Sequence, residues 1–283
     1  MPYIVDAGDT RLNFAKHFEK RSFAFQHSLA ESPLLTLEAL RGLADFYASE
    51  SMSCHFETGP SQSETWNERP DGLTVLDAFD RLNDGNILII FKSTHRCSEY
   101  AKLLSEITSE VGELLGCDMR RRYRRPILTV IVASPLRTTP YHMDDSENLL
   151  MQVKGTKSFP VFDGSDPAIL SPEEREAFWK GDGRAAIYTK EREAKANTYQ
   201  LGPGDGVHVP TTHPHLARNG NKTSVAVSVN FKELHNPARD IVRVNCRLEQ
   251  LGLKPASPGQ HLVRDHAKMA VARAMTRLHL MNN

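Results

Sequence analysis

The run from Thr139 to Lys157 constrains the fold of this 283-residue chain more than any other segment, because a histidine and an aspartate stand two positions apart in it. In an extended segment, side chains at i and i+2 point to the same face, so His142 and Asp144 can reach one metal ion together. Two imidazoles and one carboxylate form the facial ligand set that suits non-heme Fe(II) and leaves coordination positions open. The chain must therefore fold so that a histidine from a distant segment joins this pair.

Three downstream histidines compete for the third ligand position. His208, His213 and His215 lie close together after a glycine-rich turn. Each also fits a structural role, His208 as a strand histidine bonded to the backbone and His213 as a polar loop residue. Spacing alone leaves these alternatives open.

The charge balance argues against nucleic-acid and membrane partners. The chain has 35 basic and 35 acidic residues, and its formal net charge is zero. A neutral chain has no general attraction to nucleic acids or anionic membranes. The one basic cluster, from Arg120 to Arg125, reads as a solvated loop or helix end, with an anionic substrate or partner as the alternative.

The cysteines and the N-terminus point to a cytoplasmic protein. The four cysteines form no Cys-x-x-Cys pair, and their irregular spacing fits a reducing compartment. The first residues have neither the basic nor the apolar region of a signal peptide. No apolar run approaches the roughly 20 residues that a membrane span needs.

Apolar patterning divides the chain into three expected parts. Residues 1–126 are expected to form a mixed α/β part that packs on the core, and residues 127–232 a β core that holds the metal. In the core, segments 149–153 and 158–162, separated by Lys154 and Gly155, predict a β-hairpin. The recurring short strands and turns favour an all-β sandwich or barrel.

The third part, residues 233–283, is expected to be a helical tail. Apolar residues from 241 to 251 have helical spacing, Gly252 ends that helix, and a second helix is expected over residues 265–280. We expect these helices to pack on the core or to pair with a second copy of the chain as a homodimer.

Four segments together resemble the JmjC, or cupin-like, branch of the Fe(II)- and 2-oxoglutarate-dependent oxygenases. They are Thr139-Pro-Tyr-His-Met-Asp, Asn148-Leu-Leu-Met-Gln-Val-Lys-Gly-Thr-Lys, Pro203-Gly-Asp-Gly-Val-His-Val-Pro with His215 after it, and Val229-Asn-Phe. In order and spacing they are most similar to the asparaginyl hydroxylase that inhibits hypoxia-inducible factor. The resemblance covers residues 127–232 and implies a mainly β fold with flanking helices, in which the core is a double-stranded β-helix of the jelly-roll or cupin type.

The resemblance also implies the metal ligands. In such proteins the last ligand follows the proline of the Pro-Gly-Asp strand by five residues, and His215 follows Pro210 in this way. His142, Asp144 and His215 are therefore expected to bind Fe(II), and no catalytic residue is expected beyond the metal site.

Four further positions are implied to bind the cosubstrate, 2-oxoglutarate. Lys157 resembles the basic residue that pairs with its distal carboxylate, which makes sense because a buried dianion needs a cation. Thr139 resembles the hydroxyl that bonds the same carboxylate. Asn148 and Asn230 resemble amides that line the cosubstrate and oxygen side.

The implied activity is hydroxylation of a substrate C–H bond, with release of succinate and CO2. We expect a polar small molecule as the substrate, and the alternatives are hydroxylation or N-demethylation of a protein side chain. A metal cupin without oxygen chemistry, or a binding protein, is a further alternative, but Lys157 and Thr139 have no role in it.

The chain also departs from the hydroxylase pattern. Lys232 stands where the hydroxylase has an aromatic residue, and the tyrosine that usually helps to bind the cosubstrate has no clear counterpart in residues 86–92. The residues expected to face the substrate are Lys92, Arg137, Tyr141, Asp145 and Lys232.

Overall fold

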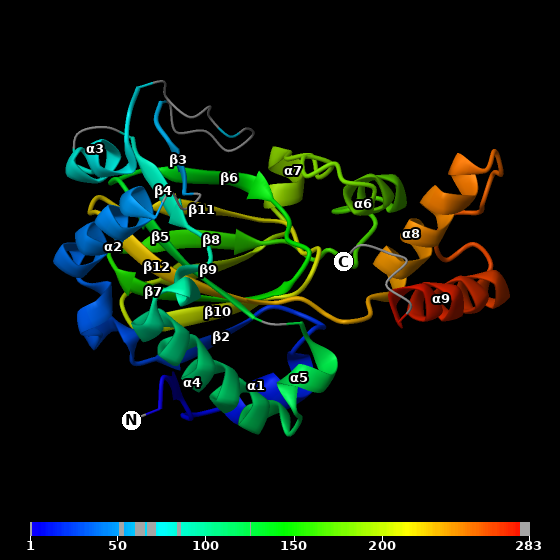
Figure 1. The fold of residues 1–283 in the computed structure, drawn as a ribbon, viewed down its shortest axis with the longest axis horizontal. Helices are drawn as coiled ribbons and strands as arrows, with labels where there is room; N and C mark the ends of the chain where they lie inside the picture. Colours follow the sequence, from blue (N-terminus) through cyan, green and yellow to red (C-terminus); the bar gives the residue numbers. More distant parts are fainter. Residues whose placement is uncertain are drawn as a thin grey trace.

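The computed structural model describes residues 2–50, 54–59, 66, 72–83, 86–124 and 126–277. Its strands form two antiparallel sheets (Figure 1), a large one in the order β1-β2-β10-β7-β12-β5-β4-β3 and a small one in the order β6-β11-β8-β9. The strand bounds are β1 Ile4–Val5, β2 Phe23–His27, β3 His55–Glu57, β4 Leu88–Phe91, β5 Ile127–Ala133, β6 Thr138–His142, β7 Glu147–Lys154, β8 Lys157–Val161, β9 Asn197–Leu201, β10 Asp205–Val209, β11 His215–Asn219 and β12 Ser224–Phe231. The helix bounds are α1 Thr10–His17, α2 Leu37–Ser49, α3 Val75–Asp80, α4 Ser98–Leu115, α5 Met119–Arg122, α6 Pro172–Trp179, α7 Lys190–Glu193, α8 Pro237–Gln250 and α9 Leu262–Arg277.

Successive strands of the core alternate between the two sheets. This holds from β5 to β8 and again from β9 to β12, where each strand lies in the sheet opposite to that of the strand before it. Two facing antiparallel sheets connected in this way form a jelly roll. The predicted fold class, a jelly-roll core with flanking helices and a helical C-terminal tail, is confirmed.

The predicted hairpin around Gly155 is wrong, because β7 and β8 do not pair with each other. β7 is already paired on both sides, with β10 and β12, so the chain crosses to the other sheet. Gly155 makes this crossing with a φ of +71°, and a Cβ there would lie 2.7 Å from the carbonyl oxygen of Thr223. Glycine adopts this left-handed backbone without steric cost. The glycine that predicted a hairpin turn instead marks the point where the chain passes from the large sheet to the small one.

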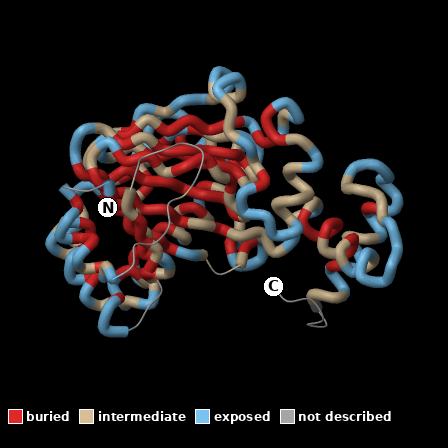
Figure 2. Tube along the Cα trace, turned by 90° about the horizontal axis from the view of Figure 1, so that it is seen from above, coloured by how far each residue is buried: buried red, intermediate tan, exposed pale blue. Residues whose placement is uncertain are grey.

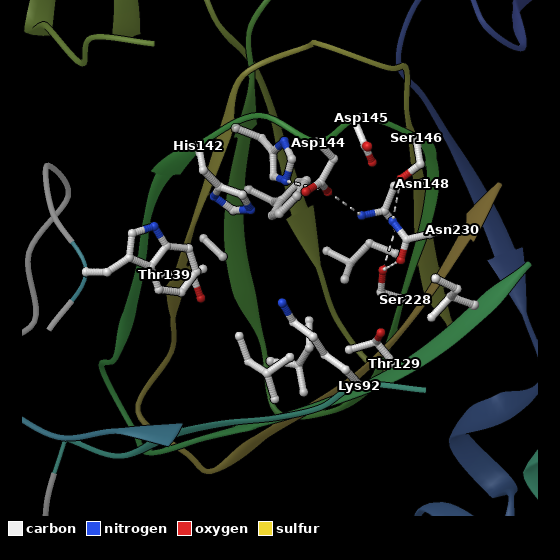
Figure 3. Close-up of a pocket in the computed structure, with 18 of the residues that line it drawn as sticks. Lys92, Thr129, Thr139, His142, Asp144, Asp145, Ser146, Asn148, Ser228 and Asn230 are labelled. Carbon is white, nitrogen blue, oxygen red and sulfur yellow. Dashed lines mark hydrogen bonds and ion pairs between the residues drawn. The ribbon is translucent and has the colours of Figure 1, made fainter. Parts of the chain in front are cut away.

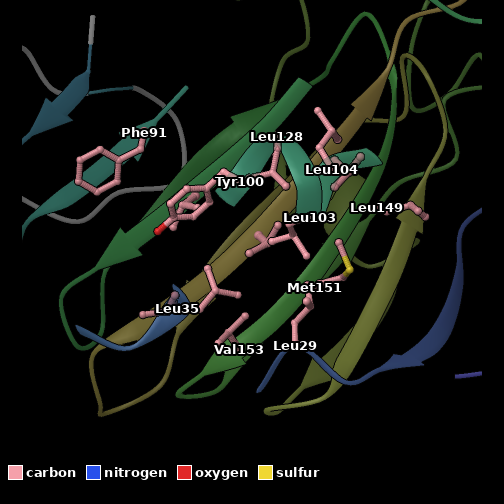
Figure 4. Packing of buried hydrophobic residues seen from close by; sticks show 14 of the residues in the cluster. Leu29, Leu35, Phe91, Tyr100, Leu103, Leu104, Leu128, Leu149, Met151 and Val153 are labelled. Carbon is pink, nitrogen blue, oxygen red and sulfur yellow. The ribbon is translucent and has the colours of Figure 1, made fainter. Parts of the chain in front are cut away.

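The strands of the first 126 residues extend the large sheet, since β2 pairs with β10 and β4 pairs with β5. Helix α4 covers the outer face of this sheet (Figure 4), and its Leu103 and Leu104 belong to the same apolar cluster as Leu128, Leu149 and Met151. Full burial of each such side chain contributes about 1.5–3 kcal/mol. This packing fixes the large sheet from outside.

The central strands of the large sheet are buried on both faces. Along β7, Leu149 faces the outer helices, whereas Asn148 and Leu150 face the interior of the sandwich. β12 brings Ser228 and Asn230 to the same interior. Polar side chains therefore line one end of the interior, and that end holds the cavity described below.

Helices α8 and α9 pack against each other at one end of the sandwich, beside α6 (Figure 1). Buried residues are concentrated in the strands, whereas this end is largely half-buried or exposed (Figure 2). Of the helix predicted over residues 265–280, the part beyond Arg277 lies outside the described residues. No described helix is both long enough and apolar enough to cross a membrane.

Arg137 and Glu57 form an ion pair inside the protein, with side-chain exposures of 1% and 0%. Nη1 of Arg137 also donates a hydrogen bond to the carbonyl oxygen of Gly59 at 2.8 Å. Since Arg137 directly precedes β6, the pair fixes the end of β3 to the strand that carries His142.

We expect Arg137→Met to lower the free energy of unfolding by about 3–5 kcal/mol, because it leaves the Glu57 carboxylate buried without its cation. The control is Arg11→Met, which removes an ion pair with Asp6 whose side chains are 64% and 47% exposed, and should cost less than about 1 kcal/mol. Urea unfolding measures both values. Adding Glu57→Leu to Arg137→Met should recover part of the loss, and equal effects of the two arginine variants would contradict the expectation.

Candidate metal centre and active site

His142, Asp144 and His215 come together where β6 and β11 pair. The two strands run antiparallel, and the register places His215 opposite His142. Asp144 follows β6, and one ligand atom from each of the three residues lies within 4.8 Å of the others. Nε2 of His215 is 3.8 Å from Oδ2 of Asp144. These separations suit three ligands that share one ion, each about 2 Å away from it.

Backbone carbonyls orient both imidazoles. Nδ1 of His142 is 2.7 Å from the oxygen of Pro140, and Nδ1 of His215 is 3.0 Å from the oxygen of His213. A carbonyl oxygen only accepts, so each Nδ1 carries the proton and each Nε2 has its lone pair available for a metal. Burial and the neighbouring His142 hold the pKa of His215 below its usual value, which favours the neutral form that ligation requires.

The other two candidate histidines have structural partners and do not join the triad. His208 is buried and stacks on Phe18, with ring centroids 4.4 Å apart. Its Nε2 lies 3.3 Å from Oε2 of Glu147. Burial lowers the pKa of His208 to about 3 and raises that of Glu147 to about 8, so the proton stays on Glu147 near neutral pH. Nε2 of His213 is 3.5 Å from Oδ1 of Asp163.

The predicted cosubstrate residues and the triad line one cavity of about 350 Å³. Thr139 comes from β6, Asn148 from β7, Lys157 from β8 and Asn230 from β12. Figure 3 shows Thr139 on one side of the metal ligands and the two asparagines on the other. The structure thus brings all of the predicted site residues together.

Lys157 is the buried cation of this cavity. It is 5% exposed, and burial lowers its pKa to about 8. Among the described residues it has neither a hydrogen bond nor an ion pair. A buried amine without an anion is costly, and this cost would be offset by an anion that enters the cavity.

Two serines that the sequence did not single out form a hydrogen-bond network with the two amides, and Asn148 links this network to the triad (Figure 3). Nδ2 of Asn148 lies 3.5 Å from Oδ2 of Asp144. Oγ of Ser228 is 2.9 Å from Oδ1 of Asn148 and from Oδ1 of Asn230, and Nδ2 of Asn230 donates to Oγ of Ser146 at 3.1 Å. The position of Ser228, two residues before Asn230 on one strand, was the available signal for this network.

The residues expected to face the substrate divide into two groups. Lys92 and Asp145 line the cavity, and Figure 3 shows the Lys92 amine pointing into it. Lys232 forms an ion pair with Asp145 at the rim. The expectation was wrong for Arg137, which is used in the buried pair with Glu57, and for Tyr141, which is buried against aromatic rings away from the cavity.

Trp66 is a cavity residue that the sequence analysis missed. Its ring lies edge-on to the imidazole of His142, with centroids 5.3 Å apart. Trp66 comes from a polar stretch without strand or helix periodicity, so no local pattern linked it to the metal ligands. It adds an aromatic wall on the His142 side of the cavity.

Comparisons with known proteins agree with this fold. A protein-family model described as a cupin-like domain matches residues 97–236. No curated protein sequence matches the chain.

Among solved structures, the chain is similar to YcfD from Escherichia coli, with a TM-score of 0.54 and 16% identity over 100% of this chain and 70% of that chain. A structure of YcfD described as a ribosomal oxygenase with cobalt and 2-oxoglutarate gives a TM-score of 0.54 at 16% identity, over 99% of this chain and 68% of that chain. A third, with cobalt and succinic acid, gives 0.50 at 18% identity, over the same shares of the two chains. At these identities the likeness shows a shared fold. The jelly roll agrees with the match of residues 97–236 to the cupin-like domain model.

Proposed function

We propose that this protein is an Fe(II)- and 2-oxoglutarate-dependent oxygenase that hydroxylates a small polar molecule. The observation that carries the proposal is the combination, in one cavity, of a two-histidine, one-carboxylate triad with the buried cation Lys157. The triad suits Fe(II). Lys157 supplies the charge that the distal carboxylate of 2-oxoglutarate needs.

When bound, Fe(II) and 2-oxoglutarate supply the oxidation: substrate C–H, O2 and 2-oxoglutarate give substrate C–OH, succinate and CO2. The protein binds, orients and excludes water. His142, Asp144 and His215 would hold the metal from one side, while Lys157 and Thr139 would fix the far end of the cosubstrate. Asn148, within 3.5 Å of Asp144, would orient that carboxylate.

The cavity also bears on the alternatives. A metal cupin without oxygen chemistry gains nothing from a buried amine that lacks an anionic partner within the described chain. Lys232 stands where the asparaginyl hydroxylase has an aromatic residue, and its ion pair with Asp145 makes the rim polar. The first observation favours an oxygenase, and the second favours a polar small molecule over the protein-directed activities.

The metal site predicts a spectroscopic result. Anaerobic addition of Fe(II) and 2-oxoglutarate should produce the weak visible charge-transfer band of the chelate. His215→Ala should abolish the band, because it removes one of three ligands. His213→Ala is the matched control and should keep it, because His213 faces Asp163 and not the metal position. No band in folded, metal-loaded wild-type protein would refute the proposed chemistry.

Lys157 predicts how the affinity for 2-oxoglutarate depends on pH. Burial places its pKa at about 8, so the amine loses its proton, and with it the attraction for a carboxylate, as pH rises through that value. Affinity measured by calorimetry with Mn(II) should be about tenfold lower at pH 9 than at pH 7. Lys157→Arg should remove this pH dependence, because a guanidinium stays charged. A dependence that is identical in Lys157→Arg would assign it to another group.

We also propose that α8 and α9 pair with a second copy of the chain. Large apolar side chains are exposed on α9 and on the segment between α8 and α9, among them Leu251 at 77%, Leu262 at 71% and Val263 at 85%. Light scattering after size exclusion should give the mass of a dimer, and Leu262→Glu with Val263→Glu should give a monomer because it adds charge to the contact. A wild-type monomer that persists at high concentration would rule the dimer out.

A further inference from the structure

A second cavity, of about 390 Å³, opens beside the triad. It shares Asp144 and Asp145 with the first cavity, so the two cavities meet at a metal ligand. Its walls include the end of α6, the end of β12 and two turns of α8, which lies beside α6 (Figure 1). Nζ of Lys180, just after α6, is 3.0 Å from Oε1 of Glu249 on α8 and holds these walls together.

Most charges in this wall already have a partner. Lys232 is paired with Asp145. The buried Arg239 donates to the carbonyl oxygens of Glu233 and Leu234 at 3.1 and 3.0 Å, and its Nε lies 3.5 Å from Oδ1 of Asp240. Asp145, the one carboxylate that lines this cavity besides the metal ligand Asp144, is thus matched by a cation.

Arg243 is the exception. It stands one turn after Arg239 on α8 and lines the cavity. It is half-buried, and within the described ranges no residue gives it a hydrogen bond or an ion pair. Burial and the charge of Arg239 lower the pKa of Arg243, and the more distant charges of Asp240 and Asp145 offset part of this effect.

The α6 side of the cavity is aromatic. Phe178 and Trp179 line it with their rings 5.1 Å apart and inclined at 62°. Nε1 of Trp179 is buried and has no acceptor in the part of the chain that the structure describes. The α6 side therefore offers a flat aromatic surface in the cavity that Arg243 also lines.

We propose that this cavity binds the substrate of the oxygenase, and that the substrate is a small molecule with a carboxylate or phosphate held by Arg243 and a flat or apolar part against Phe178 and Trp179. The inference rests on the proposed function and deepens it by naming the substrate class. A molecule seated in this way would extend past Asp145 towards Asp144 and present its C–H bond to the metal position. The volume fits a small ligand rather than a protein segment.

This assignment gives Lys157 and Arg243 different anions. Lys157 lines the first cavity, as Thr139 does, and suits the cosubstrate. Arg243 lies in the second cavity, and its planar guanidinium suits a carboxylate or phosphate that it can bind through two hydrogen bonds. The metal position is reached from both cavities, as a reaction between the two bound molecules requires.

Trp179 provides a direct test of binding that needs no turnover. The chain has two tryptophans, so Trp66→Phe leaves Trp179 as the only reporter of fluorescence. In this background, 3-phenylpropionate and phenyl phosphate should change the emission on binding, whereas neutral 3-phenylpropionamide should bind much more weakly. Arg243→Gln should weaken binding of the two anions roughly tenfold, and Arg243→Lys should weaken it less.

The control for Arg243→Gln is Arg247→Gln, on the same helix. Arg247 is exposed, bonds to Gln250 and does not line the cavity, so anion binding should be unchanged. Circular dichroism checks that each variant is folded. Equal binding of the acid and the amide, or anion binding unaffected by both Arg243 variants, would overturn the proposal.

The same titration separates this proposal from the proposed chemistry. In His215→Ala the anions should still bind through Arg243, because the triad does not form the anion contact. Arg243-dependent binding in a protein that gives no 2-oxoglutarate chelate would support the anion site and refute only the oxygenase chemistry. A chelate that forms while no anion binds at Trp179 would refute the substrate class and leave the chemistry standing.

Discussion

The antiparallel pairing of β6 with β11 is the interaction on which the site depends. It sets His142 opposite His215, and the turn that leads into β11 is fixed to the end of β6 by a hydrogen bond from the backbone N–H of Thr212 to the carbonyl oxygen of Asp144, at 2.9 Å. Ligands must be held to within about half an ångström of their productive positions. Here backbone hydrogen bonds supply that precision, and the large sheet closes the cavity from the other side.

The buried and half-buried cations of this molecule differ in whether they have a partner, and this separates structural charges from those that we assign to ligand binding. Arg137 has a carboxylate partner, and Arg239 has two carbonyl oxygens and Asp240. Lys157 and Arg243 have no such partner in the described part of the chain, and they line the two cavities that meet at Asp144. Folding tolerates a buried charge at a cost, and both of these costs fall where an outside molecule can offset them.

Local patterns in the sequence predicted many of the strands, the long helices and the pair His142 and Asp144, because these depend on alternation and helical spacing. His215 was chosen among three histidines only through the family resemblance. The prediction of a hairpin at Gly155 was wrong because a local turn pattern does not indicate which sheet has a free edge for the next strand. Arg137 was misread because its partner Glu57 is 80 positions away in the sequence. Trp66 was missed for a related reason: its place beside His142 is set by tertiary packing.

The crossing at Gly155 has a further consequence for the geometry of the cavity. A Cβ at this position would lie 2.7 Å from the oxygen of Thr223 and 3.2 Å from Cα of Ser224, so main chain touches main chain where the polypeptide passes between the sheets. Lys157 follows only two residues later. The position of Lys157 in the cavity therefore depends on a contact between two backbone segments. Side-chain substitutions elsewhere in the core do not alter that contact.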